Sequence, residues 1–311
     1  MATLSKTNFE KVQEFNRAFD MVPKEPANYS SVEIDEMGNG VINPFKYSRL
    51  QLILDEPKLI RLRLDLIKEE LDELQTAIKE NNHIEIRDAL SDILYVVYGM
   101  GDVLGINMDV LLRTVICIPI PNKFTERHIE LSKIYTNKNN RVKHTNWNLV
   151  QIYMNLFKMT FYSGLLDTLE SSSISLDKLF DEMIKVFNYL EELSTNIDIV
   201  VNKEITLTQL TNIAENLAKL IILDYTYSYL MDIDADADFS IVHSSNMSKL
   251  CDTEADAQAT VADYEAKFQA GKSPYDSPYY YALPELGKWI IKNKSTGKAL
   301  KNIKYQKVVF C

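Results

Sequence analysis

The sequence predicts an all-α fold that ends in a small β-hairpin. Apolar residues recur at spacings of three and four through most of the 311-residue chain, which is the pattern of amphipathic helices. Helix-capping residues precede several of these stretches, and the pattern changes only in the last part of the chain. The predicted helices cover residues 6–20, 57–80, 84–104, 147–169, 175–198 and 206–231, and a shorter one covers 253–269.

Capping residues fix the expected starts of three helices. Asn82 precedes the third helix and Ser175 the fifth, and both residue types accept hydrogen bonds from the free amides of a first helical turn. Thr206 and Gln209 have the spacing of a capping box at the start of the sixth. We therefore expect these helices to begin at their capping residues.

Three segments are not expected to be helical. Residues 23–48 contain prolines and glycines and read as a long loop able to fold over a site. Residues 134–145 are rich in lysine and asparagine and indicate a linker between two halves. Near the end, residues 288–293 and 299–301 flank a turn and predict a β-hairpin. We interpret this basic, aromatic tail as a capping element, with a contact to bound phosphates as the alternative.

Two neighbouring helices carry a concentration of acidic residues. Glu69, Glu70 and Glu73 fall within about 100° of one helix face, and Asp88 and Asp92 stack one turn apart on the next helix. Burying such anions together costs several kcal/mol unless a cation lies among them, and all-carboxylate ligation suits Mg²⁺ or Mn²⁺. The alternative is two solvated acidic faces. Apolar residues on both helices argue against it, because they press the helices together.

These residues resemble the MazG-like all-α nucleoside triphosphate pyrophosphohydrolases, which include phosphoribosyl-ATP pyrophosphohydrolases and dimeric dUTPases. The three glutamates match the EExxE part of the family motif, and Asp92 matches the end of its ExxD part. Ala89 stands at the ExxD glutamate position, and Asp88 is the nearest replacement carboxylate. Glu85 lies near the same face, but the pattern from Asn82 to Glu85 is that of a capping box, so we interpret Glu85 as a cap.

The resemblance implies roles for the acidic residues. Glu70, Glu73, Asp88 and Asp92 are expected to bind Mg²⁺, or alternatively Mn²⁺. Glu69 is expected either to be a further ligand or to orient and deprotonate the attacking water. Cleavage between the α and β phosphates of a nucleoside triphosphate would follow.

Two further segments carry the resemblance. Residues 8–19 are similar to the first helix of the family, which implies that Phe15 and Phe19 border the base. Residues 242–249, VHSSNMSK, resemble a loop that in many members closely follows the second acidic helix, whereas here it stands far later in the chain.

This displaced loop supplies the remaining expected substrate contacts. Lys249 is expected to contact phosphate, and Asn246 to hydrogen-bond the nucleotide. His243 is either a general acid or, as the favoured alternative, a cap or packing residue.

An internal repeat accounts for the displacement. Residues 87–109 align without a gap on residues 214–236, and the helices that precede them also align. Under this alignment the second copy replaces the acids Glu69, Glu70, Glu73 and Asp92 with Val186, Phe187, Leu190 and Lys219, and only Asp88 keeps an acidic partner, Glu215. We infer a fused, degenerate pseudodimer within one chain, with a homodimer of such chains also open. The alternative is two unrelated helical segments of similar period.

The repeat suggests three domains. Residues 1–140 form a catalytic half with the acidic metal site, residues 146–250 form a degenerate second half that ends in the SNMSK loop, and residues 251–311 form a helix and hairpin tail. The site is expected to be completed across the two halves.

Composition limits the classes of function. The net charge of −10 and the pI near 5.1 argue against a general nucleic-acid surface. The apolar runs are too short to span a bilayer. The three cysteines show no paired spacing, and no signal peptide is apparent, which favours a reducing, cytoplasmic location.

The expected activity is hydrolysis of NTP or dNTP to the monophosphate and diphosphate, in nucleotide-pool control. The chain has neither a GxSxG motif nor a P-loop, so acyl transfer and P-loop ATP hydrolysis are disfavoured. One alternative is phosphoribosyl-ATP hydrolysis in histidine biosynthesis. Another, of a different class, is a nucleotide-binding or scaffold protein with weak catalysis.

Overall fold

The protein divides into two compact units, which we describe separately. The computed structural model describes residues 6–22, 33–34, 40–41, 49, 52–116, 175–195 and 207–310. The terminal unit comprises residues 1–24 and 236–311, and the central unit comprises residues 25–235. The elements, in chain order, are α1 (Asn8–Ala18), β1 (Glu33–Ile34), β2 (Gly40–Val41), α2 (Leu52–Asp55), α3 (Pro57–Glu80), α4 (His83–Val103), α5 (Met108–Ile116), α8 (Leu176–Thr195), α9 (Leu207–Leu230), α10 (Ala235–Met247), α11 (Glu254–Gln269), β3 (Pro278–Leu283) and β4 (Lys288–Asn293).

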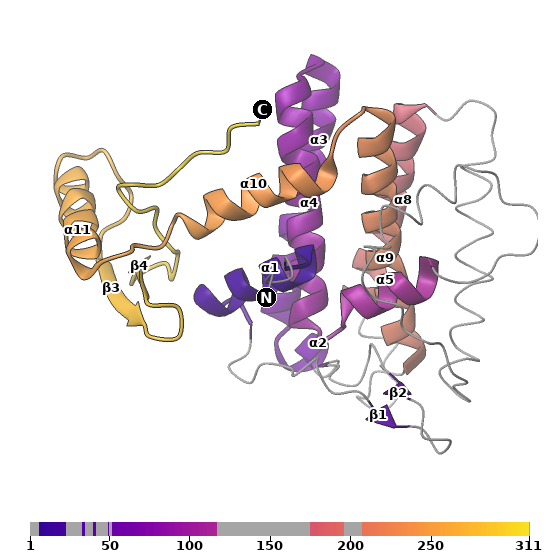
Figure 1. Ribbon diagram of the computed structural model, residues 1–311, viewed down its shortest axis with the longest axis horizontal. Helices are drawn as coiled ribbons and strands as arrows, with labels where there is room; N and C mark the ends of the chain where they lie inside the picture. Colours follow the sequence, from indigo (N-terminus) through magenta and orange to yellow (C-terminus); the bar gives the residue numbers. More distant parts are fainter. Residues whose placement is uncertain are drawn as a thin grey trace, which may run out of the picture. The chain divides into compact units, whose positions relative to one another are not determined.

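The central unit is built from two helix pairs, α3 with α4 and α8 with α9 (Figure 1). Asn81 ends α3 in the left-handed conformation, with φ of 50°, and the Asn82 side chain accepts a hydrogen bond from the Glu85 amide to start α4. The turn is so short that α4 must run back along α3. Across the pairs, α3 packs on α8 and α4 on α9. An ion pair of 2.7 Å joins Arg61 near the start of α3 to Glu191 near the end of α8, so these two helices are antiparallel.

Apolar stripes fix which face of α3 points outward. Its core residues recur at spacings of three and four and are essentially inaccessible to solvent; they are Ile60, Leu64, Ile67, Leu71 and Leu74. Each such side chain contributes about 1.5–3 kcal/mol by burial. The glutamates between them are therefore held at or near the surface of the pair.

In the terminal unit, α1 and α10 lie side by side and run in the same direction. Lys11 donates to the Ser240 hydroxyl at 2.8 Å, and one turn later Glu14 lies 3.5 Å from His243. The β3–β4 hairpin is antiparallel and pairs Tyr281 with Ile290.

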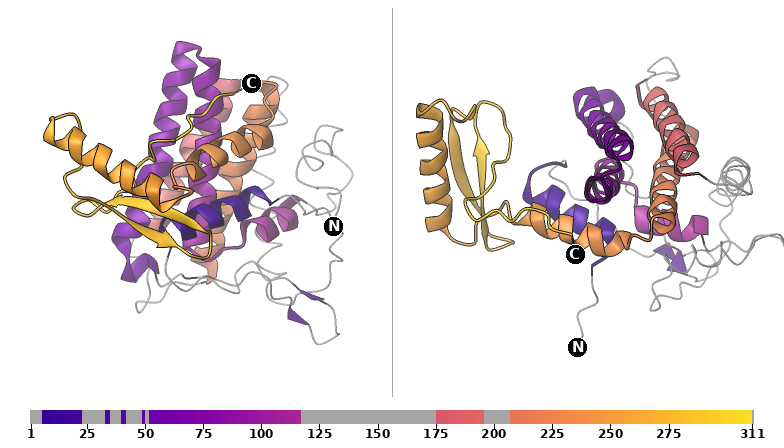
Figure 2. Two further views of the ribbon diagram at one scale, coloured as in Figure 1. Left: turned by 60° about the vertical axis from the view of Figure 1, so that its left-hand side comes forward. Right: turned by 90° about the horizontal axis from the view of Figure 1, so that it is seen from above.

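The two faces of this hairpin contact different helices (Figure 2). Ile290 packs in a cluster with Phe19 at the end of α1. Its neighbour Ile291 packs in a second cluster with Ala257 of α11, as expected from the alternation of side chains along a strand. Asp20, just after α1, accepts hydrogen bonds from Tyr281 and Lys292 of the hairpin.

The predicted all-α class with a C-terminal hairpin is confirmed, and two local predictions are wrong. Residues 242–247 are helical and belong to α10, so the expected SNMSK loop is a helix end followed by a turn at Ser248 and Lys249. The hairpin partner of residues 288–293 is β3, and only an isolated bridge joins Lys292 to Ala299.

Several predictions fall outside the described residues. These are the helix at 147–169, the linker at 134–145 and the Thr206 cap. The predicted division into residues 1–140, 146–250 and 251–311 concerns duplication rather than compactness, and it stays a prediction.

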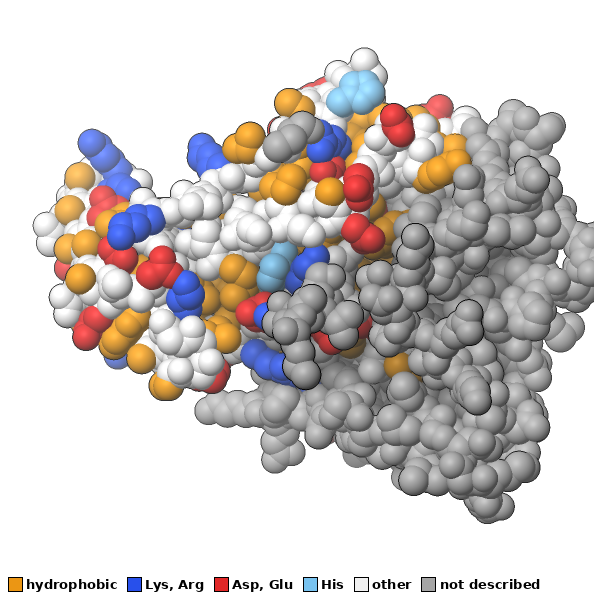
Figure 3. Space-filling view, in the orientation of Figure 1, with side chains coloured by type: hydrophobic (Ala, Val, Ile, Leu, Met, Phe, Trp, Pro, Cys, Tyr) orange, Lys and Arg blue, Asp and Glu red, His pale blue; other side chains and the backbone are white. Residues whose placement is uncertain are grey.

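The surface carries charges of both signs, and the described helices are not strongly apolar. On the face shown in Figure 3, basic and acidic side chains are interspersed over α11 and the hairpin. Across the part of the chain that the structure describes, no helix has the length and apolarity needed to cross a membrane.

Candidate metal and nucleotide site

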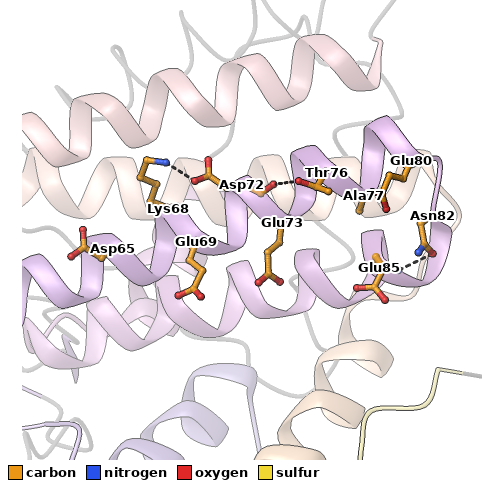
Figure 4. A pocket seen from close by; sticks show the side chains of 10 residues that line it. All are labelled: Asp65, Lys68, Glu69, Asp72, Glu73, Thr76, Ala77, Glu80, Asn82 and Glu85. Atoms are coloured by element: carbon orange, nitrogen blue, oxygen red, sulfur yellow. Dashed lines mark hydrogen bonds and ion pairs between the residues drawn. The ribbon is translucent and has the colours of Figure 1, made fainter. Parts of the chain in front are cut away.

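An open acidic groove of about 770 Å³ runs along α3 and the start of α4 (Figure 4). Six carboxylates line it, from Asp65, Glu69, Asp72, Glu73, Glu80 and Glu85. Lys68 is the basic residue among the lining side chains, and it forms an ion pair with Asp72. The groove therefore carries a strong excess of negative charge, which attracts cations.

The helical repeat explains the orientation of the glutamates. Glu69 and Glu73 are four residues apart and project from the same side of α3, toward the side on which Glu85 lies (Figure 4). Both are exposed, whereas Glu70 is partly buried next to the apolar stripe. The cluster thus has an accessible outer part and a deeper inner part.

Burial and four other carboxylates of the cluster raise the pKa of Glu70. Burial raises the pKa of its carboxyl to about 9, and repulsion from Asp92, Glu73, Glu69 and Asp88 adds to the shift. All five influences act in one direction, so none of them stabilises a charged Glu70. The helices bring together the two groups that the sequence predicted on separate faces.

Two neighbours show the same behaviour. The pKa of Glu73 is raised by partial burial and by Glu69, Asp88 and Glu85. The pKa of Asp88 is raised by burial and by Glu85. One carboxylate oxygen of Asp88, Oδ1, is buried and has no hydrogen-bond partner among the residues that the structure describes. A buried acceptor without a partner costs about 1–3 kcal/mol, and a bound cation would remove that cost.

The donor set fits a hard divalent cation. Its members are all carboxylates, repel one another and include an unpartnered buried oxygen, and Mg²⁺ and Mn²⁺ prefer oxygen ligands. Among the described residues, no three acidic, histidine or cysteine side chains already converge closely enough to hold an ion. Ligation would therefore require the exposed glutamates to change rotamer, which is a small adjustment for surface side chains.

Glu85 belongs to this acidic cluster, although the sequence pattern assigned it to a cap. The Asn82 half of the cap is present, but the Glu85 carboxylate lies at the groove and raises the pKa values of Glu73 and Asp88. The signal was available in the sequence, because residues 85 and 88 are three apart and share a helix face.

The predicted substrate residues gather in the terminal unit. Lys249 Nζ lies 5.6 Å from the centroid of the Phe15 ring and donates to Asn246 Oδ1 at 2.6 Å. Phe15 stacks on Phe19 with a centroid separation of 4.2 Å. Phe19 is only 3% exposed and packs in the hydrophobic cluster, so Phe15 offers the more accessible ring.

His243 occupies a position between α1 and α10. Its Nε2 lies 3.5 Å from Glu14, which also receives a 2.6 Å ion pair from Lys6. Burial lowers the pKa of His243, and the Glu14 carboxylate opposes that shift. These contacts favour a packing role over that of a general acid. The structure describes this cluster and the acidic groove within separate units, so the expected completion of one site across the halves stays a prediction.

Comparison with known proteins agrees with this geometry. The phosphoribosyl-ATP pyrophosphohydrolase family model matches residues 54–116, which include α3 and α4 and hence every predicted metal ligand. Residues 54–116 therefore form a domain of the MazG-like all-α superfamily. This family match suggests a pyrophosphohydrolase-like activity.

A full-length relative is also known. Over 305 residues the chain is 33% identical to the uncharacterized protein L479 of Acanthamoeba polyphaga mimivirus, covering 97% of this chain and 93% of that protein. The similarity thus extends well beyond the acidic helices, through the terminal unit as well. No solved structure matches the chain significantly.

Proposed function

We propose that the protein is a divalent-cation-dependent nucleoside triphosphate pyrophosphohydrolase, which converts an NTP or dNTP and water to the monophosphate and diphosphate. The observation that carries the proposal is the Glu70 carboxyl, whose pKa is raised to about 9 among four other acids on the helix pair that the family model matches. Strongly shifted pKa values of this kind cluster at functional sites.

The acids divide into ligands and a candidate base. Glu70, Glu73, Asp88 and Asp92 would hold the cation, which when bound polarises phosphoryl oxygens and lowers the pKa of water. Glu69 is exposed at the groove and either adds a ligand or accepts the proton of the attacking water.

The terminal unit supplies the proposed substrate contacts. Lys249 lies beside the accessible Phe15 ring and bonds to Asn246, so a cation, an amide and an aromatic face are close together. Phosphate, nucleotide polar atoms and base are the groups that these three side chains bind best.

A substrate screen tests the activity. Purified protein is incubated with each NTP and dNTP in Mg²⁺ or Mn²⁺, and diphosphate release is measured. We expect turnover that a chelator abolishes. Glu73→Gln and Asp92→Asn should each lower kcat at least about 100-fold while the protein stays helical, whereas Glu192→Gln, at an exposed position on α8, should not. Full turnover by both the Glu73→Gln and the Asp92→Asn variant would refute the assignment.

The phosphate contact is tested separately. Removal of one lysine from a partly buried site costs about 1–3 kcal/mol of transition-state stabilisation. Lys249→Ala should therefore lower kcat/KM about tenfold or more, with Lys272→Ala in the exposed turn after α11 as control. An unchanged kcat/KM would remove Lys249 from the site.

Phosphoribosyl-ATP is the second candidate substrate, because the family model that matches residues 54–116 carries that name. It belongs in the same screen. Absence of turnover on every substrate would favour the scaffold alternative, which Ala89 at a family ligand position motivates.

A further inference from the structure

One serine in the last turn of α10 and one just after the helix hold residues 302–306, which we call the C-terminal segment. Ser245 Oγ lies 2.7 Å from the Gln306 carbonyl oxygen and 3.0 Å from the Tyr305 hydroxyl. A serine hydroxyl has one hydrogen, so it donates to the carbonyl and accepts from the tyrosine. Ser248 Oγ accepts from the Gln306 amide at 3.0 Å and donates to the Ser245 carbonyl at 2.7 Å.

Asn302 anchors the other end of the C-terminal segment. Its Nδ2 donates to the Leu250 carbonyl at 2.9 Å, and the side chain is buried. Lys304 adds a 2.7 Å ion pair to Asp256 at the start of α11. The residues on both sides of Lys249 are therefore bonded to the same segment.

This arrangement matters because Lys249 lies beyond the last turn of α10. Helix ends fray, and ordering a lysine side chain costs up to about 2 kcal/mol of entropy. A turn held from both sides keeps the lysine backbone fixed and so reduces the disorder that a bound phosphate must remove.

We propose that Ser245, Ser248 and Tyr305 are positioning residues, which hold Lys249 and Asn246 in the orientation that binds substrate phosphate. This inference rests on the proposed function, in which those two side chains contact the nucleotide. The serine hydroxyls are engaged in hydrogen bonds and act through Lys249.

Hydrogen exchange of the full-length protein tests the structural part of the proposal without any activity. In Ser248→Ala and in Tyr305→Phe, amides of residues 244–250 should exchange at least about tenfold faster than in the unmodified protein. The matched control is Ser244→Ala, because the Ser244 hydroxyl donates within α10, to the Ser240 carbonyl at 2.9 Å. Unchanged exchange in both variants would overturn the proposal.

Kinetics test the functional part. Ser248→Ala should raise KM about fivefold or more and change kcat less than about twofold, because it weakens phosphate binding and not the chemical step. In a Lys249→Ala background the same change should add little, since Ser248 acts through that lysine. A fall in kcat with KM unchanged would overturn the positioning role.

A binding measurement separates failure of this inference from failure of the proposed function. If the unmodified protein hydrolyses no nucleotide, the proposed function fails. Calorimetric binding of inorganic tripolyphosphate is then compared, and Ser248→Ala should bind at least about fivefold more weakly. Equal affinity of the variant and the unmodified protein, or no binding by either, would overturn the positioning role.

Discussion

The two helix pairs of the central unit carry different kinds of side chain at matching positions on α3 and α8. Under the repeat alignment, Val186, Phe187 and Leu190 stand where the first pair has Glu69, Glu70 and Glu73. The three apolar residues are 7%, 3% and 0% exposed, whereas Glu69 and Glu73 face solvent. A helix pair of this kind can therefore be built with a core face at these positions, so the acids of the first pair are not needed for folding.

The second helices of the two pairs, α4 and α9, also differ in charge. Asp88 and Asp92 add negative charge around Glu70, while their counterparts Glu215 and Lys219 form an ion pair of 2.8 Å. One pair concentrates like charge and the other cancels it. The comparison indicates that the first pair carries an electrostatic cost that the second pair lacks.

The packing of the pairs suits a common origin. Each helix contacts its counterpart, α3 against α8 and α4 against α9, and contacts between equivalent surfaces are what an approximate two-fold axis produces. The duplication itself stays a prediction.

The contrast between the two pairs predicts that an acid placed in the second pair lowers the free energy of unfolding. Leu190 is fully buried, so Leu190→Glu places an unpaired charge in the core and should lower the free energy of unfolding by about 3–5 kcal/mol. Urea denaturation measures this. Glu73→Leu at the matching exposed position is the control and should not destabilise. A loss below about 1 kcal/mol in Leu190→Glu would show that the two pairs are equally tolerant of acids.

A smaller effect is expected from the buried acid of the second pair. Asp224 on α9 is inaccessible to solvent, and within the described part of the chain neither of its carboxylate oxygens has a hydrogen-bond partner. Burial raises its pKa well above the usual value. Val97 occupies the matching position of α4. Asp224→Val should therefore stabilise the protein by about 1–3 kcal/mol in thermal or urea unfolding. Asp224→Asn keeps an unpaired polar group and should gain less, and destabilisation by the valine would contradict the inference.

The smallest expected effect concerns the pH dependence of the metal-free protein. In the folded protein the pKa of Glu70 is raised to about 9, whereas the usual pKa of a glutamate is 4.5. Because the native state binds more protons between these values, stability should fall as pH rises through that range. We expect a total loss of about 1–2 kcal/mol, since Glu70 is only partly buried.

The Glu70→Gln variant isolates this contribution. Urea midpoints measured from pH 5 to 9 in chelator should show a flatter profile for Glu70→Gln than for Glu192→Gln. Added Mg²⁺ should stabilise the unmodified protein more at high pH than at low pH, because ligands must be deprotonated to bind it. Parallel profiles of the two variants would show that Glu70 is not the titrating group.

Local rules predicted the helices and brought the acids together. Helical spacing and the Asn82 cap fix the relation between α3 and α4, so the proximity of Glu70 and Asp92 followed from the sequence. The depth of Glu70 did not, because it depends on how neighbouring helices cover a residue only about 100° from the exposed Glu69.

The two wrong predictions concern the strand partner of residues 288–293 and the conformation of residues 242–249. Both Gly287 and Gly297 have positive φ and both mark possible hairpin turns, and packing against α1 and α11 selects the pairing of β3 with β4. For α10, the family resemblance suggested a loop, although Asp236 and Asp238 provide the acidic first turn of a helix.

The terminal unit combines a segment that precedes the central unit with one that follows it, which has a consequence for synthesis on the ribosome. Its helix α1 is translated before the central unit, whereas its partners α10 and the β3–β4 hairpin are translated after that unit. Ala18 and Phe19, which pack with Ile290 of the hairpin in the finished protein, have no such partners while the central unit is being made. Domains fold as units during translation, so the central unit can form first. The apolar residues at the end of α1 are then left to chaperones or to transient contacts until the hairpin emerges.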